Sequence, residues 1–177
     1  MHGIKLDLDG HIDLKDLESE LNRCLQERQP VYAVVAIMGS TEEGAADQLS
    51  AIIDLRKKFQ LKGLSFLVHA DAAWGGYFAS MIPRKLMTQP ISWGGTGDEA
   101  VGIVPSLPLR KDTMTDMIAL KEADSITVDP HKAGYIPYPA GSLVYRDGRM
   151  RFLVTWTSPY LSQGSSENIG VYGVEGR

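Results

Sequence analysis

The sequence contains only one cysteine, Cys24, among its 177 residues. A single cysteine cannot form an intrachain disulfide, and it adds little to a metal site built from cysteine and histidine. The N-terminal stretch "MHGIKLDLDG" also lacks the basic and then apolar pattern of a secretory signal. We therefore expect the chain to occupy a reducing compartment, most simply the cytoplasm.

Long basic runs and long apolar runs are missing as well. The 18 lysine and arginine residues form no stretch that would follow a phosphate backbone or an anionic bilayer, and the formal net charge is −4. The longest apolar stretches, such as 31–38, are far shorter than the roughly 20 residues of a membrane-spanning helix. We therefore expect neither nucleic acid nor a membrane as a partner.

What the sequence does contain is the pattern of an α/β fold, with 44% hydrophobic and 23% charged residues. Period-2 alternation predicts a short strand over 4–8, and leucines at helical spacing predict a helix over about 13–28. The run "VYAVVAIM" is typical of a strand covered on both faces. A helix over about 47–60 and a second strand, "LSFLVHADAA", complete a strand–helix–strand crossover unit.

The second half of the chain is more irregular. Residues 81–111 carry several prolines and glycines, and we interpret them as a surface excursion. The segment "DTMTDMIALKEA" predicts a further helix, Ile126 and Val128 alternate as in a strand, and Gly141 to Tyr145 predict another strand. No linker divides the sequence, so we expect a single unit.

Three polar loops each follow a predicted strand: "MGSTEEGAAD", "HADAAWGG" and "DPHKAG". Ligands of open parallel sheets bind at this carboxyl edge, so Asp71 and Lys132 should converge there. Each residue also has a simpler interpretation, because an acid that ends a strand is often a helix N-cap and a lone lysine is often solvated. His69 and Asp71 have no evident third metal ligand, and we predict no metal site.

Together, "HADAAWGG" and "SITVDPHKAGYIPYPAGSLVYRD" resemble the core of the pyridoxal-phosphate-dependent group II amino-acid decarboxylases. This family includes glutamate, aromatic-amino-acid and tyrosine decarboxylases. "GSTEEGAAD" is similar to another turn of the same family, and "DPHKAGYIPY" is most similar to the tyrosine-decarboxylase-like branch. The resemblance covers nearly the whole chain. It implies an α/β fold that is part of the large domain of fold-type I, aspartate-aminotransferase-like, pyridoxal-phosphate-dependent transferases.

The resemblance also implies a task for five residues. Lys132 would hold pyridoxal 5′-phosphate through an imine, and Asp71 would pair with the pyridine nitrogen so that the ring can act as an electron sink. Ala73 would pack on one ring face, where a flat ring needs small neighbours. Thr41 would lie beside the cofactor, and His131 would be oriented toward its phosphate.

The family resemblance bears on two further residues, Asp129 and Tyr160. Many family members carry asparagine where this sequence has Asp129, and because a carboxylate repels phosphate we expect no direct phosphate contact from Asp129. The segment "TWTSPYLSQGSSENIG" matches a family loop whose tyrosine protonates the carbanion after CO₂ leaves, and Tyr160 is the best match for it. The alternative for Tyr160 is an exposed turn aromatic.

The implied reaction is decarboxylation of an L-amino acid to an amine and CO₂ by a homodimer, with tyrosine and other aromatic substrates ahead of glutamate. We interpret residues 1–177 as the lysine-bearing half of a pyridoxal-phosphate-binding large domain. The N-terminal phosphate-cup region and the C-terminal small domain of the family are not recognisable, so we expect no activity from this fragment alone. The alternatives are a non-catalytic truncated paralogue that only associates with other subunits, and a related enzyme such as an aldehyde synthase.

Overall fold

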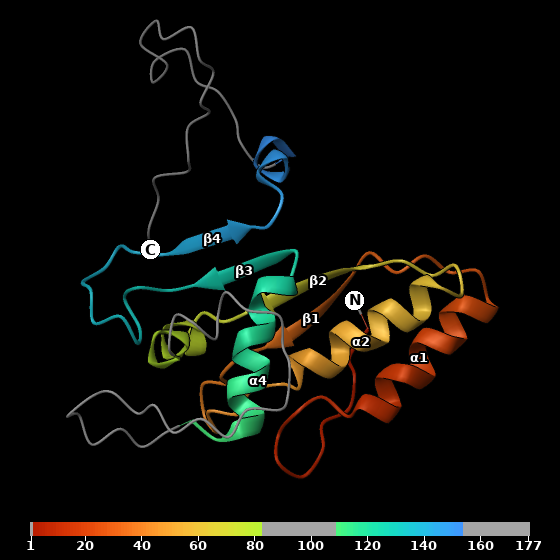
Figure 1. Ribbon diagram of the computed structural model, residues 1–177, viewed down its shortest axis with the longest axis horizontal. Coiled ribbons are helices and arrows are strands. Elements are labelled where there is room, and N and C mark those ends of the chain that lie inside the picture. Colours follow the sequence, from red (N-terminus) through yellow and green to blue (C-terminus); the bar gives the residue numbers. More distant parts are fainter. Residues whose placement is uncertain (1, 83–108, 154–177) are drawn as a thin grey trace, which may run out of the picture.

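A computed structural model describes residues 2–82 and 109–153 of the chain. Its elements are α1 (Leu14–Gln26), β1 (Ala33–Ile37), α2 (Leu49–Gln60), β2 (Leu67–Asp71), the 3₁₀ helix η1 (Gly75–Met81), α4 (Lys111–Ala119), η2 (Leu120–Glu122), β3 (Ser125–Val128), β4 (Ser142–Tyr145) and η3 (Gly148–Leu153) (Figure 1). This order confirms the predicted succession of strands and helices from α1 onward. The predicted strand over 4–8 is wrong, because there only Leu6 forms an isolated bridge with Ile12. Most of the predicted excursion over 81–111 lies outside the described residues.

The four strands form one sheet in the order β1-β2-β3-β4 (Figure 1). β1, β2 and β3 are parallel, and β4 is antiparallel to β3. The register places Ile37 beside Asp71 and Asp71 beside Thr127. Because parallel strands end at the same edge, the loops after β1, β2 and β3 leave from one edge of the sheet, as the sequence predicted.

Local capping explains where α1 begins. The side chain of Asp13 accepts hydrogen bonds from the backbone N–H groups of Lys15 and Asp16, at 2.8 and 3.3 Å. These bonds satisfy amides that have no partner within the helix. Leu17 and Leu21, four residues apart, then bury one face of α1 against the core.

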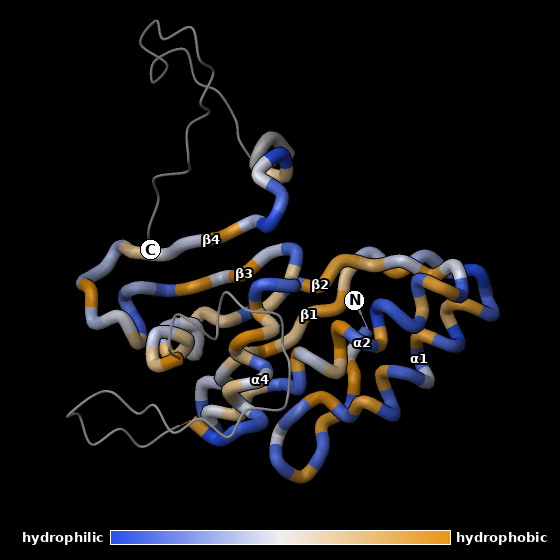
Figure 2. The backbone as a smooth tube through the Cα atoms, viewed as in Figure 1, coloured by the Kyte–Doolittle hydropathy of each residue, from blue (hydrophilic) through white to orange (hydrophobic). Residues whose placement is uncertain are grey.

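The core lies between the sheet and the helices α1, α2 and α4, which cover one face of it (Figure 1). Its largest fully buried side chains are Phe59, Met38, Leu49, Ile52, Ile53 and Val68. Figure 2 shows hydrophobic residues along β1 and β2, the strands against which these helices pack. Within the described ranges, no helix is both long and apolar enough to cross a bilayer.

The opposite face of the sheet differs from the prediction for β1. Val34 and Ala36 are buried beneath the helices, whereas Val35 and Ile37 are 50% and 46% exposed. Among the residues that the structure describes, β1 is thus covered on one face, and the expectation of two covered faces was wrong. Asp71 is in register with Ile37, and alternation along a strand places it on this uncovered face.

Buried carboxylates connect the elements on the helix side. Asp47 is 3% exposed and accepts the backbone N–H groups of Ile12 at 2.7 Å and Ile37 at 2.6 Å. Asp116 in α4 accepts both the backbone N–H and the hydroxyl of Ser50, at 2.9 and 2.6 Å. Burial raises the pKa of both aspartates, opposed in each case by these hydrogen bonds.

Candidate functional site

Asp71 is the last residue of β2 and is half-buried. Its Oδ1 accepts the backbone N–H of Ala73 at 3.2 Å, which fixes the carboxylate at the start of the loop. It is not the N-cap of the helix that follows, because the N-cap of η1 is Trp74. A carboxylate accepts several hydrogen bonds, so Asp71 keeps the capacity to bind a further donor from the uncovered face.

The small residues after Asp71 have a packing reason that the sequence analysis missed. A Cβ atom on Gly75 would lie 1.9 Å from the carbonyl oxygen of Met38, at the end of β1. A Cβ on Gly76 would lie 3.0 Å from a methyl carbon of Val128, at the end of β3. The loop after β2 therefore passes directly against the ends of both neighbouring strands, and Gly75 is required by the backbone itself.

His69 lies on the same face of β2 as Asp71 and is held by two hydroxyl groups. Its Nδ1 is 2.8 Å from Ser125 Oγ, and its Nε2 is 3.2 Å from Thr127 Oγ1. Both ring nitrogens thus have partners on β3. His69 and Asp71 are therefore not arranged as a pair of metal ligands.

The loop after β3 brings Lys132 next to the loop that follows Asp71. The backbone N–H of Asp129 donates to the carbonyl of Ala73 at 3.1 Å, and the backbone N–H of Lys132 donates to the carbonyl of Asp129 at 3.0 Å. The side-chain Nζ of Lys132 lies 3.0 Å from Oδ2 of Asp129. Lys132 and Asp71 are thus carried by two loops that are hydrogen-bonded to each other.

His131 is fixed on the side of this loop that faces residues 138–140. Its Nδ1 is hydrogen-bonded to the carbonyl of Ala140, and its ring packs on Tyr138 with 3.9 Å between ring centroids. Its Nε2 lies 3.9 Å from Asp129 Oδ2, so two basic groups face the same carboxylate oxygen. Orientation of His131 toward a phosphate stays a prediction.

Thr41 is exposed in the turn after β1. The backbone N–H groups of Gly39 and Ser40 both donate to the carbonyl of Ala45, and the Ser40 hydroxyl accepts the N–H of Ala45 at 3.1 Å. This closed turn holds Thr41 at the same sheet edge as the other two loops. Its cofactor contact, like that of Ala73, stays a prediction, and Tyr160 lies outside the described residues.

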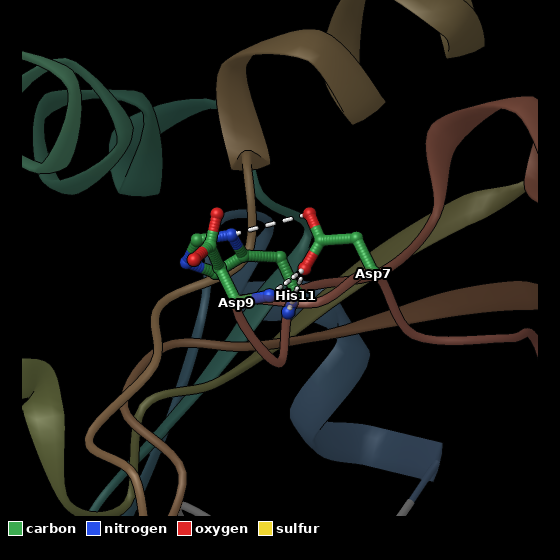
Figure 3. Close-up of side chains that lie close together, drawn as sticks. All are labelled: Asp7, Asp9 and His11. Atoms are coloured by element: carbon green, nitrogen blue, oxygen red, sulfur yellow. Dashed lines mark hydrogen bonds and ion pairs between the residues drawn. The ribbon is translucent and has the colours of Figure 1, made fainter.

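Two other features of the described residues include neither Asp71 nor Lys132. Asp7, Asp9 and His11 bring ligand atoms within 4.8 Å of one another (Figure 3). Asp7 is 3.5 Å from His11 Nδ1 and accepts the backbone N–H groups of Asp9 and His11, both at 2.9 Å. The backbone N–H of His11 is the main cause that lowers the pKa of Asp7. These contacts stabilise an exposed turn.

The second feature is a cavity of about 330 Å³ where α2 and α4 begin. Its lining includes His11, Ser50, Arg110, Asp112 and Asp116, and it contains neither Asp71 nor Lys132. The titratable groups of this lining are already engaged: Asp116 is bonded to Ser50, Asp112 is paired with Arg110, and His11 is paired with Asp7. The candidate site is therefore the edge that carries Asp71 and Lys132.

Comparison with known proteins identifies the family of the chain. The family model of the pyridoxal-dependent decarboxylase conserved domain matches residues 1–92. The chain is 33% identical over 181 residues to an L-tyrosine decarboxylase of Enterococcus faecium, covering 99% of this chain and 30% of that protein. It is 33% identical over 184 residues to an L-tyrosine decarboxylase of Levilactobacillus brevis, covering 98% of this chain and 29% of that protein. The chain belongs to the pyridoxal-dependent decarboxylase family.

The fold agrees with that membership. The solved glutamate decarboxylase domain of a diaminobutyrate-pyruvate transaminase and L-2,4-diaminobutyrate decarboxylase from Vibrio parahaemolyticus superposes with a TM-score of 0.58 at 23% identity. The match covers 85% of this chain and 26% of that one. The prediction of a fold-type I large-domain segment is confirmed. The chain spans about 30% of the length of the curated relatives it matches.

Proposed function

We propose that this chain supplies the lysine-bearing half of a pyridoxal 5′-phosphate site in a protein that decarboxylates an L-amino acid to an amine and CO₂. One observation carries the proposal: the loops of Asp71 and Lys132 leave neighbouring parallel strands and are joined by the hydrogen bond from Asp129 to Ala73. Membership of the pyridoxal-dependent decarboxylase family supports it.

The chemistry of these side chains fits the cofactor. Pyridoxal phosphate presents an aldehyde, a protonatable ring nitrogen and a phosphate, and when bound it draws electrons away from the carbon that loses CO₂. Lys132 offers the primary amine that an aldehyde requires, and Asp71 offers a carboxylate for the nitrogen. His131 offers an imidazole to the phosphate, and Thr41 offers a hydroxyl from the third loop.

Asp71 has the more specific task. A half-buried carboxylate is costly unless it has a partner, and a protonated ring nitrogen would be one. The bond from the Ala73 N–H fixes its orientation before a ligand arrives. Asp71 would therefore keep the proton on the ring nitrogen throughout the reaction, and Tyr160 would return a proton to the substrate carbon after CO₂ leaves.

The substrate class follows from the relatives. Two of them are named L-tyrosine decarboxylases, so we propose tyrosine first, other aromatic amino acids next and glutamate after them. We further propose a cytoplasmic homodimer, supported by the single cysteine and by the family resemblance. Formation of an aldehyde in place of the amine is the alternative outcome that a product assay separates.

The cofactor proposal can be tested on the 177-residue chain itself. Incubated with pyridoxal phosphate, the chain should develop visible absorbance, and borohydride should trap the cofactor on a peptide that contains Lys132. Peptide mapping by mass spectrometry identifies the modified lysine. Modification of a different lysine would contradict the assignment.

The reaction needs a complete enzyme. This chain can replace its matched segment in the Enterococcus faecium relative, and the chimera can be given tyrosine, dopa and glutamate with amine and aldehyde both quantified. We expect the amine, fastest from tyrosine. A folded, cofactor-loaded chimera that forms no amine from any of the three would contradict the proposed reaction.

A further inference from the structure

Lys132 and Asp129 form an ion pair at the centre of the candidate site. Nζ of Lys132 lies 3.0 Å from Oδ2 of Asp129, and the side chains are 37% and 17% exposed. Asp129 is the position at which many family members carry asparagine, so in this sequence a negative charge stands where those members have a neutral amide. A phosphate-binding task for Asp129 conflicts with its charge, whereas its position in the structure gives it another partner.

The backbone fixes this pair. Asp129 donates its N–H to Ala73 and accepts the N–H of Lys132, so both residues belong to a turn that is anchored to the loop after Asp71. In this turn the two side chains reach the same side. His131 Nε2 lies 3.9 Å from the same oxygen, and its ring is held by Ala140 and Tyr138. The backbone of Asp129 is therefore fixed by bonds that do not involve its side chain, and Lys132 and His131 are the basic groups beside its carboxylate.

The pair bears directly on the chemistry of the amine. An ammonium group that donates to a carboxylate has no lone pair with which to attack a carbonyl carbon. Before the nitrogen can react, it must lose a proton and move away from Asp129. A half-buried carboxylate favours the contact, because separation would leave it with less compensation for its charge.

We propose that Asp129 is a positioning residue. It holds the Lys132 side chain in an ion pair, and this hold limits how readily the lysine amine attacks a carbonyl group. The relevance to cofactor capture rests on the proposed function, but the hold itself is a property of this chain alone. Asp129→Asn keeps the shape of the side chain and removes its charge. This substitution should therefore make Lys132 more reactive.

Competitive acetylation measures how strongly the ion pair with Asp129 limits the reactivity of the Lys132 amine, and it needs no cofactor. Trace acetic anhydride forms an amide bond between the neutral lysine nitrogen and one acetyl carbon, while acetate leaves and the nitrogen's proton passes to solvent. Labelling of Lys132 is quantified by mass spectrometry relative to the exposed Lys111 of the same molecule. Asp129→Asn should raise this ratio about threefold, the size expected for loss of a partly exposed ion pair, and Asp129→Glu should restore slow labelling.

The test also includes a matched control substitution and a measurement on the unmodified chain. Asp54→Asn removes one charge from another aspartate–lysine pair at the same sequence spacing, Asp54 with Lys57, and should leave Lys132 labelling unchanged. In the unmodified chain, salt at about 1 M screens the pair and should raise the Lys132 ratio as well. This second measurement decides the matter if Asp129→Asn fails to fold.

The outcomes separate this inference from the proposed function. Equal Lys132 labelling in the unmodified chain and in a folded Asp129→Asn variant, or no response to salt, would overturn the hold. Raised labelling together with a borohydride-trapped cofactor on another lysine would support the hold and overturn the proposed function. Raised labelling together with faster cofactor capture at Lys132 supports both.

Discussion

The backbone N–H of Asp129 donates to the carbonyl oxygen of Ala73 at 3.1 Å. This bond continues the contact between β2 and β3 past the ends of both strands, where the chain would otherwise separate into independent loops. Ala73 is in turn bonded through its own N–H to Asp71. Asp71 at the end of β2 and the turn that carries Lys132 are thus linked by a short series of hydrogen bonds that runs through Ala73 and Asp129.

Lys132→Arg should abolish the borohydride-trapped cofactor adduct and the visible absorbance. The guanidinium keeps the positive charge but stays protonated near neutral pH, so it cannot condense with an aldehyde. Circular dichroism should be unchanged, since the Lys132 side chain is 37% exposed and packs in no core. Lys111→Arg, at an exposed position in α4, is the control and should leave the adduct intact.

Asp71→Asn should remove the negative charge of this residue while keeping its hydrogen bond to the N–H of Ala73. The amide oxygen can still accept the N–H of Ala73, so the loop and the adduct on Lys132 should persist. In the chimeric enzyme we expect kcat to fall by about 10²–10³-fold, the usual loss when a positioned electrostatic partner is removed. Retention of full turnover by the asparagine variant would show that Asp71 does not serve the ring nitrogen.

Gly75→Ala should destabilise the fold. The new Cβ would lie 1.9 Å from the carbonyl oxygen of Met38, and backbone atoms on both sides must move to accommodate it. We expect a loss of about 3 kcal/mol in the free energy of unfolding, measured by urea denaturation. Gly148→Ala is the matched control, because its Cβ would meet no atom within 4 Å.

Asp47→Asn should lower the free energy of unfolding by an amount that depends on pH. Burial raises the folded-state pKa of Asp47 above its ordinary value of 3.8, so the folded chain binds this proton more tightly than the unfolded chain. The resulting stabilisation is fully present below pH 3.8 and is lost as the pH rises through the raised pKa. The stability difference between the unmodified chain and the variant should therefore be larger near pH 3.5 than near pH 7.

Urea denaturation of both proteins across this pH range measures that difference directly. Titrations of all other groups are common to the two proteins and cancel in the comparison. A difference that grows with pH would mean that the bonds from Ile12 and Ile37 outweigh burial and lower the pKa of Asp47.

The order of the elements from α1 onward, and the sheet edge at which the candidate site lies, could be predicted from the sequence. Apolar periodicity is a local property, so the helices and the strands of the crossover unit could be predicted from neighbouring residues. Right-handed parallel crossovers then require that loops following successive strands meet at one edge. Asp71 and Lys132 could therefore be assigned to the same edge from their positions after two predicted strands, and the motifs around them indicated the family.

Tertiary structure alone decided which contacts those residues make. Gly75 is small because the carbonyl of Met38, far away in sequence, approaches it, and no local pattern contains that information. The same holds for Val35 and Ile37, whose burial depends on which other segments reach that face of the sheet. The pairing of Lys132 with Asp129 required a turn geometry that is set by the bond from Asp129 to Ala73, between loops of different strands. Periodicity reports on neighbours along the chain, whereas these contacts depend on neighbours in space.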